Sequence, residues 1–389
     1  MKKKVLIFSG GRQDYYLLKP LVSELLKINT LEAGFLLGET HFSKLYGKTI
    51  NQIKKDKIPV WGKIYSKIDG DSPLNIINKM ANTSIKVSKI LLKIKPTVIV
   101  LLGDRYELLA TAQAAMLHNI PIAHLHGGES TEGVIDEAIR HSISKMSHIH
   151  FVSTKKYYTR LVQMGENPRY VFNHGALGID NIKNLEVLSK KKLFNSLDLN
   201  INYKTFLITY HPLTLDQETS NLQLNNLLKV LLNFKKTNLV FTYPNSDTYG
   251  LAIIKTIKKF IKNQNIKSIF VENLGSTRYL NLIKYSNLII GNSSSGIIEA
   301  PSLGIPTINI GKRQNGRVQA ASVIQAKGTK KSILDSIKLG LEKEFIKKAK
   351  LKKNPYGKGK SALKIAYTLN KIDYKNIIFK KFYDINFYK

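Results

Sequence analysis

The chain contains no cysteine among its 389 residues, which excludes disulfide bonds, thiolate nucleophiles and cysteine-ligated metal sites. It also has no apolar run near the ~20 residues that span a bilayer. Its basic start is followed by the short apolar run VLIF and soon by Arg12 and Asp14, which does not fit a signal peptide. These absences predict a cytoplasmic protein that does not associate with membranes.

Acidic residues are scarce, because 27 Asp and Glu face 61 Lys and Arg and the formal net charge is +34. A charge of this size can indicate nucleic-acid binding. The lysines are spread along the chain, however, in segments such as TIKKFIKNQNIK and LEKEFIKKAKLKK, and no nucleic-acid-binding motif is present. The charge therefore indicates a lysine-rich surface that favours a small anionic ligand, and it predicts no specific nucleic-acid partner.

Short apolar segments alternate with longer amphipathic segments throughout the chain. The apolar segments are 4–10, 32–39, 96–103, 120–126, 149–154 and 170–175 in the first half, and 206–212, 238–245, 267–274, 287–293 and 305–311 in the second half. Strands that are apolar on both faces and separated by helices predict parallel sheets covered on both sides.

The predicted fold class is therefore α/β, with two Rossmann-like, doubly wound domains. The polar segment 177–203 places the boundary, so we expect domains at 1–177 and 178–356, with a C-terminal helix and tail (357–389) that returns to the first domain. Sheets of this kind bind ligands at the carboxyl ends of their strands. Two facing sheets would form a ligand-binding cleft.

Two predicted strands of the first half end in residues that can carry chemistry. SGGRQDYY follows the first strand, where two glycines permit a tight turn and Arg12 projects from it. LLGDRYE places Asp104 and Arg105 at the carboxyl edge of the sheet, although Asp104 can equally cap the next helix. Neither motif is G-x-G-x-x-G, so no dinucleotide site is predicted.

The stretch GNSSSGIIEAPSLGIP predicts a phosphate-binding turn in the second half. A helix N-terminus offers free N–H groups and a positive dipole end, and Ser293 and Ser294 add hydroxyl donors. Glu299 lies about one turn later, where it can accept hydrogen bonds from ribose. The next strand is followed by three basic residues suited to a diphosphate, Lys312, Arg313 and Arg317. The alternative is an ordinary serine N-cap beside surface arginines.

Titratable residues gather in AHLHGGESTEGVIDEAIRHSISKMSHIHF, residues 123–151. His124 and His126 alternate on a predicted strand and would share one face, and Glu129 follows the Gly-Gly turn. One helix face then carries Glu137, Arg140 and His141. Histidines with carboxylates can hold Zn²⁺ or Mn²⁺, but there is no H-E-x-x-H and arginines can balance a diphosphate, so no metal is predicted.

These motifs together resemble the UDP-N-acetylglucosamine 2-epimerase family, specifically its hydrolysing branch. The resemblance runs over roughly the first 320 residues and is carried by GRQDYYLLKPL, LLGDRYELLATAQAA, HLHGGESTEGVIDEAIRHSISKMSHIHF, GALGIDN, YHP, YPNSD and GNSSSGIIEAPSLGIPTINIGKRQNGR. It implies a GT-B-like pair of Rossmann-type domains and a homodimer. It also implies release of UDP and of N-acetylmannosamine, or its 4-acetamido-6-deoxy relative, for sialic or legionaminic acid synthesis.

The resemblance further implies roles for individual residues. Contacts to UDP or the sugar are implied for Arg12, Arg105, Asn245, Ser293, Ser294, Glu299 and Arg313. Catalytic roles are implied for Asp104, His126, Glu129, Glu137 and His211. Some relatives have glutamate where this chain has His126, so a base at that position would here be an imidazole. Which residue is the acid and which the base stays open.

The expected reaction needs no cofactor. UDP leaves C1 as a proton leaves C2, which gives a glycal that is then hydrated, so the site needs cationic groups for the diphosphate and acid–base groups for the ring. The alternatives are a non-hydrolysing epimerase, which returns UDP to the sugar, and a GT-B glycosyltransferase, which needs an acceptor. The substituents at C4 and C6 of the sugar, the oligomeric state and any allosteric regulation are not predicted by the residue spacing.

Overall fold

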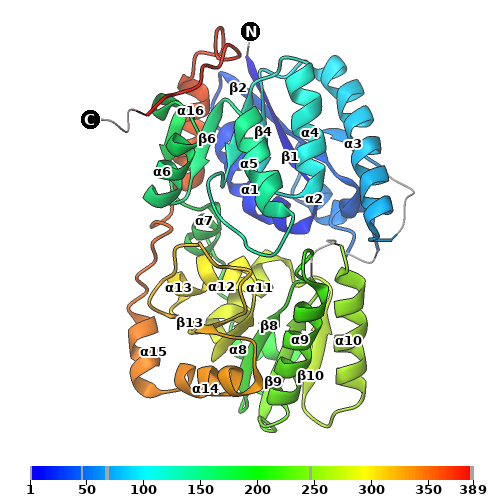
Figure 1. Cartoon of the computed structure of the whole chain (residues 1–389), viewed down its shortest axis with the longest axis vertical. Coiled ribbons are helices and arrows are strands. Elements are labelled where there is room, and N and C mark those ends of the chain that lie inside the picture. Colours follow the sequence, from blue (N-terminus) through cyan, green and yellow to red (C-terminus); the bar gives the residue numbers. More distant parts are fainter. Residues whose placement is uncertain (1, 45–46, 66–69, 245–247, 386–389) are drawn as a thin grey trace. The chain divides into compact units, whose positions relative to one another are not determined.

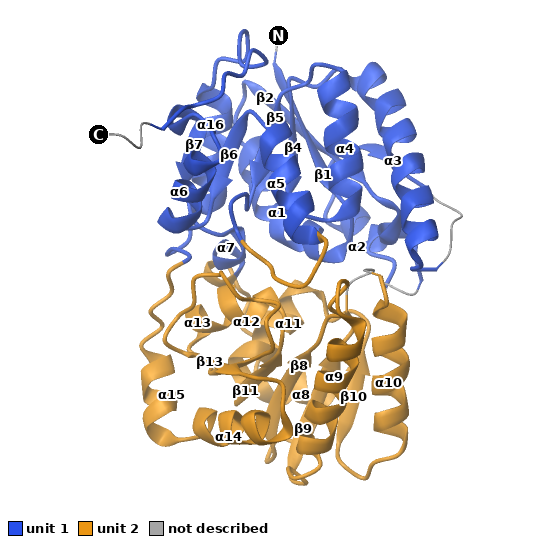
Figure 2. Ribbon diagram, in the orientation of Figure 1, with its two compact units in different colours: residues 1–129, 136–181, 356–389 blue, residues 130–135, 182–355 orange. Residues whose placement is uncertain are grey.

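The computed structural model describes all residues except 1, 45–46, 66–69, 245–247 and 386–389. The chain divides into two compact units, which Figure 2 shows in different colours. Unit 1 contains residues 1–129, 136–181 and 356–389, and unit 2 contains residues 130–135 and 182–355. Each unit is a sheet covered by helices (Figure 1).

The sheet of unit 1 has seven parallel strands in the order β3-β2-β1-β4-β5-β6-β7. The strands are β1 (Lys3–Ser9), β2 (Leu31–Leu37), β3 (Val60–Lys63), β4 (Val98–Leu102), β5 (Ile122–Leu125), β6 (Ile149–Val152) and β7 (Val171–Asn173). The strand order reverses between β1 and β4, which is the switch point at which doubly wound sheets bind ligands.

Helices cover both faces of this sheet. They are α1 (Arg12–Leu26), α2 (Ile50–Lys55), α3 (Pro73–Ile94), α4 (Tyr106–Leu117), α5 (Asp136–Met146), α6 (Lys155–Gln163), α7 (Leu177–Lys183) and α16 (Ser361–Lys371), with short 3₁₀ helices at Glu39–Phe42 and Pro168–Tyr170. Alternate residues of β1 point to opposite faces: Val5 and Ile7 pack with α1 and α16, whereas Leu6 and Phe8 pack with α3 and α4. The C-terminal helix α16 therefore completes the core of unit 1.

Unit 2 repeats this architecture with six parallel strands in the order β10-β9-β8-β11-β12-β13. The strands are β8 (Lys204–Thr209), β9 (Thr237–Thr242), β10 (Ser268–Val271), β11 (Leu288–Gly291), β12 (Thr307–Ile310) and β13 (Val323–Ala326). The helices are α8 (Lys190–Ser196), α9 (Gln217–Leu231), α10 (Gly250–Lys262), α11 (Gly275–Tyr285), α12 (Ser294–Ile298), α13 (Ala300–Leu303), α14 (Lys330–Gly340) and α15 (Lys343–Lys350). Its switch point lies between β8 and β11.

The predicted fold class, two Rossmann-like doubly wound domains, is confirmed, and each predicted strand is present. The edge strands β3 and β13 were not predicted. The chain changes units after residues 181 and 355 rather than at the expected 177 and 356, and residues 130–135, expected in the first domain, belong to unit 2. Among the described residues, no helix is long and apolar enough to cross a membrane.

Candidate active site

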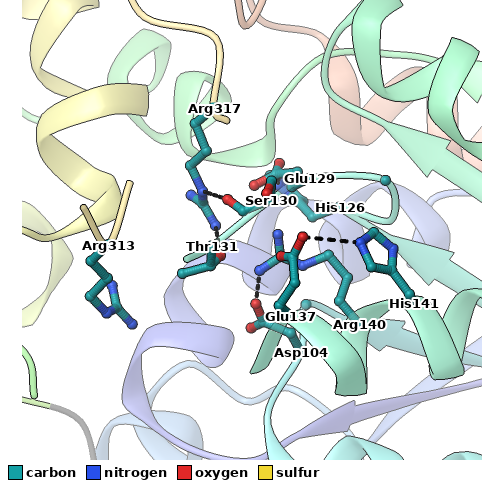
Figure 3. A network of polar contacts seen from close by, with 12 residues as sticks. Asp104, His126, Glu129, Ser130, Thr131, Glu137, Arg140, His141, Arg313 and Arg317 are labelled. Carbon is teal, nitrogen blue, oxygen red and sulfur yellow. Dashed lines mark hydrogen bonds and ion pairs between the residues drawn. The ribbon is translucent and has the colours of Figure 1, made fainter. Parts of the chain in front are cut away.

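Three neighbouring strand ends assemble the polar cluster of unit 1. β4, β5 and β6 pair in parallel, so their carboxyl ends lie at one edge of the sheet. Asp104, His126 and Ser153 each lie within two residues of these ends. Predicted site residues from separate motifs therefore come together in this unit, because helix α5 adds Glu137, Arg140 and His141 (Figure 3).

Asp104 is held by an ion pair that the sequence did not reveal. Its Oδ2 contacts Nη2 of Arg140, whose side chain is only 2% exposed (Figure 3). A buried guanidinium requires a counter-charge, so this pair fixes Asp104 against α5. One turn apart on the same helix, Nε2 of His141 lies 3.2 Å from Oε1 of Glu137. The N-cap of α4 is Arg105, so Asp104 does not fill the capping position that the sequence also allowed.

His126 and Glu129 form a second pair. Nδ1 of His126 lies 2.7 Å from Oε1 of Glu129, and Oγ of Ser153 donates to the same oxygen at 2.9 Å. Glu129 is 1% exposed and Ser153 2% exposed. The carboxylate therefore accepts hydrogen bonds from two side chains inside the protein.

His124 does not belong to this site, contrary to the prediction that it shares a face with His126. Its Nε2 donates to the carbonyl of Gly103 at 2.7 Å and its Nδ1 accepts from Oγ of Ser144 at 3.0 Å. Burial lowers the pKa of His124 to about 3, so it is a neutral structural residue. The alternation fails because β5 ends at Leu125 and His126 adopts a left-handed φ of 64°.

At the switch point of unit 1, the turn after β1 is built around a buried carboxylate. The N–H of Gly10 donates to Oδ2 of Asp14 at 2.8 Å, and burial raises the pKa of Asp14 to about 6. Arg105 follows β4, and Glu107 binds its guanidinium through Nε and Nη2 at 3.2 and 2.9 Å. Arg12 is the first residue of α1. Both arginines thus lie next to the ends of β1 and β4, as expected.

In unit 2, His211 is positioned through its backbone. The N–H of His211 donates to Oδ1 of Asn292 at 2.7 Å, and Nδ2 of Asn292 donates to the carbonyl of His211 at 2.9 Å. Both residues are buried, at 2% and 0% exposure. Asn292 follows β11 and His211 follows β8, which are adjacent strands. The asparagine thereby links the two strand ends.

The serine turn begins as the sequence predicts. Ser293 is the N-cap of α12, and its Oγ accepts from the N–H of Ser295, while Ser294 opens the helix. Glu299 stands between α12 and α13. Nη1 of Arg313 donates to the carbonyl of Asn292 at 3.2 Å, so this arginine lies beside the turn. The predicted contact residue Asn245 lies outside the described residues.

Arg317 contacts the segment 130–135, and its predicted contact with a diphosphate stays a prediction. Its Nε donates to the carbonyl of Ser130 at 3.1 Å and its Nη2 to Oγ1 of Thr131 at 3.4 Å (Figure 3). Asn315 binds Glu132 at 2.9 Å. The loop after β12 therefore holds the segment 130–135, which explains why this segment belongs to unit 2.

Among the described residues, no group of three or more His, Asp or Glu side chains could hold a metal ion.

The sequence identifies the family of this chain. A sequence profile described as UDP-N-acetylglucosamine 2-epimerase matches residues 23–370. The chain belongs to this family. It is 40% identical over 325 residues to a Campylobacter jejuni protein named GDP/UDP-N,N'-diacetylbacillosamine 2-epimerase (hydrolyzing), covering 84% of each chain. It is 36% identical to the Escherichia coli polysialic acid biosynthesis protein P7 over 98% of each chain.

A third relative is the UDP-N,N'-diacetylbacillosamine 2-epimerase (hydrolyzing) of Legionella pneumophila, 32% identical over 98% of this chain and 99% of that protein. These names support the predicted hydrolysing enzyme over the non-hydrolysing alternative. The UDP-GlcNAc 2-epimerase of Neisseria meningitidis, solved with UDP-GlcNAc bound, has a TM-score of 0.81 at 20% identity and covers 96% of this chain and 100% of that one. The GT-B-like fold is thereby confirmed, and the cleft between the domains stays a prediction.

Three residues hold predicted site residues in place and were not predicted to do so, namely Arg140, Asn292 and Ser153. Arg140 was noted only as part of a helix face, and its ion pair with Asp104 depends on tertiary packing. Asn292 and Ser153 were not singled out. Asn292 directly follows β11 and Ser153 directly follows β6. A small polar residue directly after a buried strand was the sequence signal that could have identified these two.

Proposed function

We propose that this protein is a hydrolysing 2-epimerase that converts a UDP-activated N-acetylhexosamine and water into UDP and the free 2-epimeric sugar. Family membership and the names of its relatives support the reaction class. The observation that carries the proposal is the set of acid–base groups at adjacent strand ends of unit 1, namely Asp104 with Arg140 and His126 with Glu129.

The sugar we expect first is 2,4-diacetamido-2,4,6-trideoxyglucose, which is N,N'-diacetylbacillosamine, and N-acetylglucosamine second. Relatives of 40% and 32% identity carry the first sugar in their names, and one of 31% identity from Neisseria meningitidis is named UDP-N-acetylglucosamine 2-epimerase. The product would be the corresponding mannose-type sugar, a precursor of legionaminic or sialic acid. The nucleotide-sugar substrate places the reaction in the cytoplasm.

The chemistry begins with loss of UDP. A C2–H bond next to an unactivated C1 is not acidic, so the proton leaves as the C1–O bond to UDP breaks and a C1=C2 double bond forms. Arg12, Arg105 and Arg313 are suited to stabilise the charge that develops on the diphosphate. The serines at 293 and 294 can donate to its oxygens, and Glu299 can accept from ribose.

Hydration of the resulting glycal completes the reaction. Water supplies the hydroxyl group of C1, and a proton is delivered to C2 on the face opposite to the one from which it left. Epimerisation therefore requires two acid–base groups on different sides of the ring. We assign the second group to one of three residues: Asp104, which follows β4, Glu137, in the first turn of α5, or His211, which follows β8.

The test is incubation of the pure protein with UDP-GlcNAc and with UDP-N,N'-diacetylbacillosamine in deuterated water. We expect stoichiometric free UDP and free sugar with one deuterium at C2. A UDP-sugar product would indicate the non-hydrolysing reaction, and UDP release only when an acceptor is added would indicate a glycosyltransferase. Absence of C2 deuterium in any product would refute the epimerase proposal.

The protein is further proposed to form a homodimer through α3 and α4. Apolar residues on one face of α3 are strongly exposed, with Leu74, Ile77, Ile85 and Leu92 at 66, 61, 59 and 60%. The two helices are joined by a hydrogen bond of 2.7 Å between Oγ of Ser88, in α3, and Nε2 of His118, the C-cap of α4. Leu117, next to this bond, is 79% exposed.

The resemblance implies a homodimer, and we propose that a second copy covers this apolar face. Light scattering should give twice the chain mass for the wild type and the monomer mass for Ile85→Glu. Leu222→Glu, a matched change at a leucine that is 60% exposed in unit 2, should stay dimeric. A monomeric wild type would refute the homodimer without affecting the enzymatic proposal.

A further inference from the structure

His126 occupies a backbone conformation that disfavours its own side chain. Its φ of 64° is left-handed, where a residue with a Cβ is less stable than glycine by about 1 kcal/mol. The backbone is fixed there, because the N–H of His126 donates to the carbonyl of Phe151 at 2.9 Å and extends the pairing of β5 with β6. The chain thus holds the imidazole of His126 at a turn that glycine would form at lower cost, which makes this side chain a candidate for a functional role.

The hydrogen bonds of this imidazole determine its tautomer. A carboxylate only accepts hydrogen bonds, so Oε1 of Glu129 requires the proton of His126 to be on Nδ1. The hydroxyl of Ser153 donates to the same oxygen, which holds the carboxylate in place. Nε2 then carries the lone pair and can accept a proton.

Nε2 of His126 is buried and forms no hydrogen bond with any described residue. Leaving a buried acceptor without a partner costs about 1–3 kcal/mol. His124, two residues earlier, is the internal comparison: both of its ring nitrogens are bonded, and its donation to Gly103 requires the opposite Nε2–H tautomer. Both ring nitrogens of His124 are thus hydrogen-bonded, whereas Nε2 of His126 has no hydrogen bond to any described residue.

We propose that Nε2 of His126 is the base that removes the C2 proton, and that Glu129 and Ser153 are positioning residues that orient its ring. This inference rests on the epimerase function proposed above. In the step, Nε2 takes the C2 proton and becomes an imidazolium, and the C–H electron pair forms the C1=C2 bond. The C1–O electron pair leaves with UDP. The positive charge that develops on the ring is stabilised by the carboxylate of Glu129, in the manner of a catalytic triad.

The first experiment needs no substrate. The protein is labelled with ¹⁵N-histidine, and two-bond ¹H–¹⁵N correlations assign each tautomer, with His126→Asn identifying the signals of His126. We expect the Nδ1–H form for His126 and the Nε2–H form for His124. Ser153→Ala should shift the ring signals of His126, whereas Ser147→Ala should not, although Ser147 is equally buried at 0% exposure and also hydrogen-bonded. An Nε2–H tautomer at His126 overturns the proposal even if the enzyme is active.

The second experiment measures turnover and C2 deuteration. His126→Asn should lose both, and Glu129→Gln should lower kcat by on the order of 10²-fold or more. Ser153→Ala should lower kcat about tenfold with KM within about twofold, Ser153→Thr should restore most of the rate, and Ser147→Ala should match the wild type. Wild-type deuteration in His126→Asn overturns the proposal. An inactive wild type would instead refute the proposed function, and the tautomer would still be decided by the first experiment.

Discussion

Glu166 forms the centre of a buried charge cluster in unit 1. Its side chain is 1% exposed, its Oε1 lies 2.8 Å from Nζ of Lys145, and its Oε2 lies 2.8 Å from Nε2 of His150 and 2.6 Å from Nζ of Lys380. Burial alone raises the pKa of Glu166, but the contacts with His150 and the two lysines outweigh it and lower the pKa from 4.5 to about 2. The folded state therefore favours the ionised carboxylate.

Glu166→Gln should remove a stabilisation that depends on pH. The pKa difference of about 2.5 units corresponds to about 3 kcal/mol of folding free energy at pH 7. Because the folded pKa is the lower one, this contribution is present above pH 4.5 and is lost as the pH falls towards 2. The difference in unfolding free energy between wild type and Glu166→Gln should shrink from about 3 kcal/mol at pH 7 to about 1 kcal/mol at pH 3.

Urea unfolding followed by circular dichroism at pH 7, 5, 4 and 3 measures this difference. Lys380→Met should also destabilise the protein, because it leaves part of the Glu166 charge unpaired. Glu344→Gln is the control, since the ion pair of Glu344 with Lys347 is 81% and 73% exposed and should contribute less than about 0.5 kcal/mol. A difference between wild type and Glu166→Gln that stays constant from pH 7 to pH 3 would refute the electrostatic account.

Three further changes test the strand ends. Asn292→Ala should remove the hydrogen-bond partner of the buried N–H and carbonyl of His211 and lower the free energy of unfolding by about 2 kcal/mol. Calorimetry should still detect UDP binding, and product analysis should show a lower kcat. Arg140→Met should lower kcat at least tenfold because Asp104 loses its counter-charge, and Arg140→Lys should recover part of it in steady-state kinetics. Asp14→Asn should stabilise the protein by about 2–3 kcal/mol at pH 8. Burial raises the pKa of Asp14 from 3.8 to about 6, so ionisation of this carboxyl destabilises the folded state at pH values above 6. This gain should vanish below about pH 4 in the same urea assay.

The central strands could be predicted from the sequence because they are apolar on both faces. β1, β4, β8 and β11 lie in the middle of their sheets, where helices bury both faces, and each appears as an uninterrupted apolar run. The edge strand β10 was predicted from its apolar run IFV, whereas β3 (VWGK) and β13 (VIQA) were not predicted because each has only two consecutive apolar residues and is largely half-exposed. Such segments lose the hydrophobic pattern that identifies a strand.

The candidate site residues could be predicted from their motifs, but the contacts that each of them makes could not. Strand ends identified Asp104, His126 and His211, because polar residues after buried strands are exposed to ligand in α/β folds. Which partner each one takes depends on tertiary packing, and spacing contains no information about it. Arg317 illustrates the limit, because spacing could not show that its guanidinium donates to the carbonyl of Ser130.

Helix α5 connects the C-terminal segment to the geometry of Asp104. Nζ of Lys380 donates to the carbonyls at positions 145 and 147, at 2.8 and 2.7 Å, and so caps the C-terminal end of the helix. Ser144, in the last turn of α5, binds His124, which binds the carbonyl of Gly103 beside Asp104. Arg140, a turn earlier, binds Asp104 directly. Two links thus join α5 to the turn after β4: Arg140 contacts Asp104 directly, and Ser144 acts through the buried His124. Reorientation of the Asp104 carboxylate would break its ion pair with the buried Arg140. The position of Asp104 therefore depends on packing far from it in the sequence, including that of the C-terminal segment.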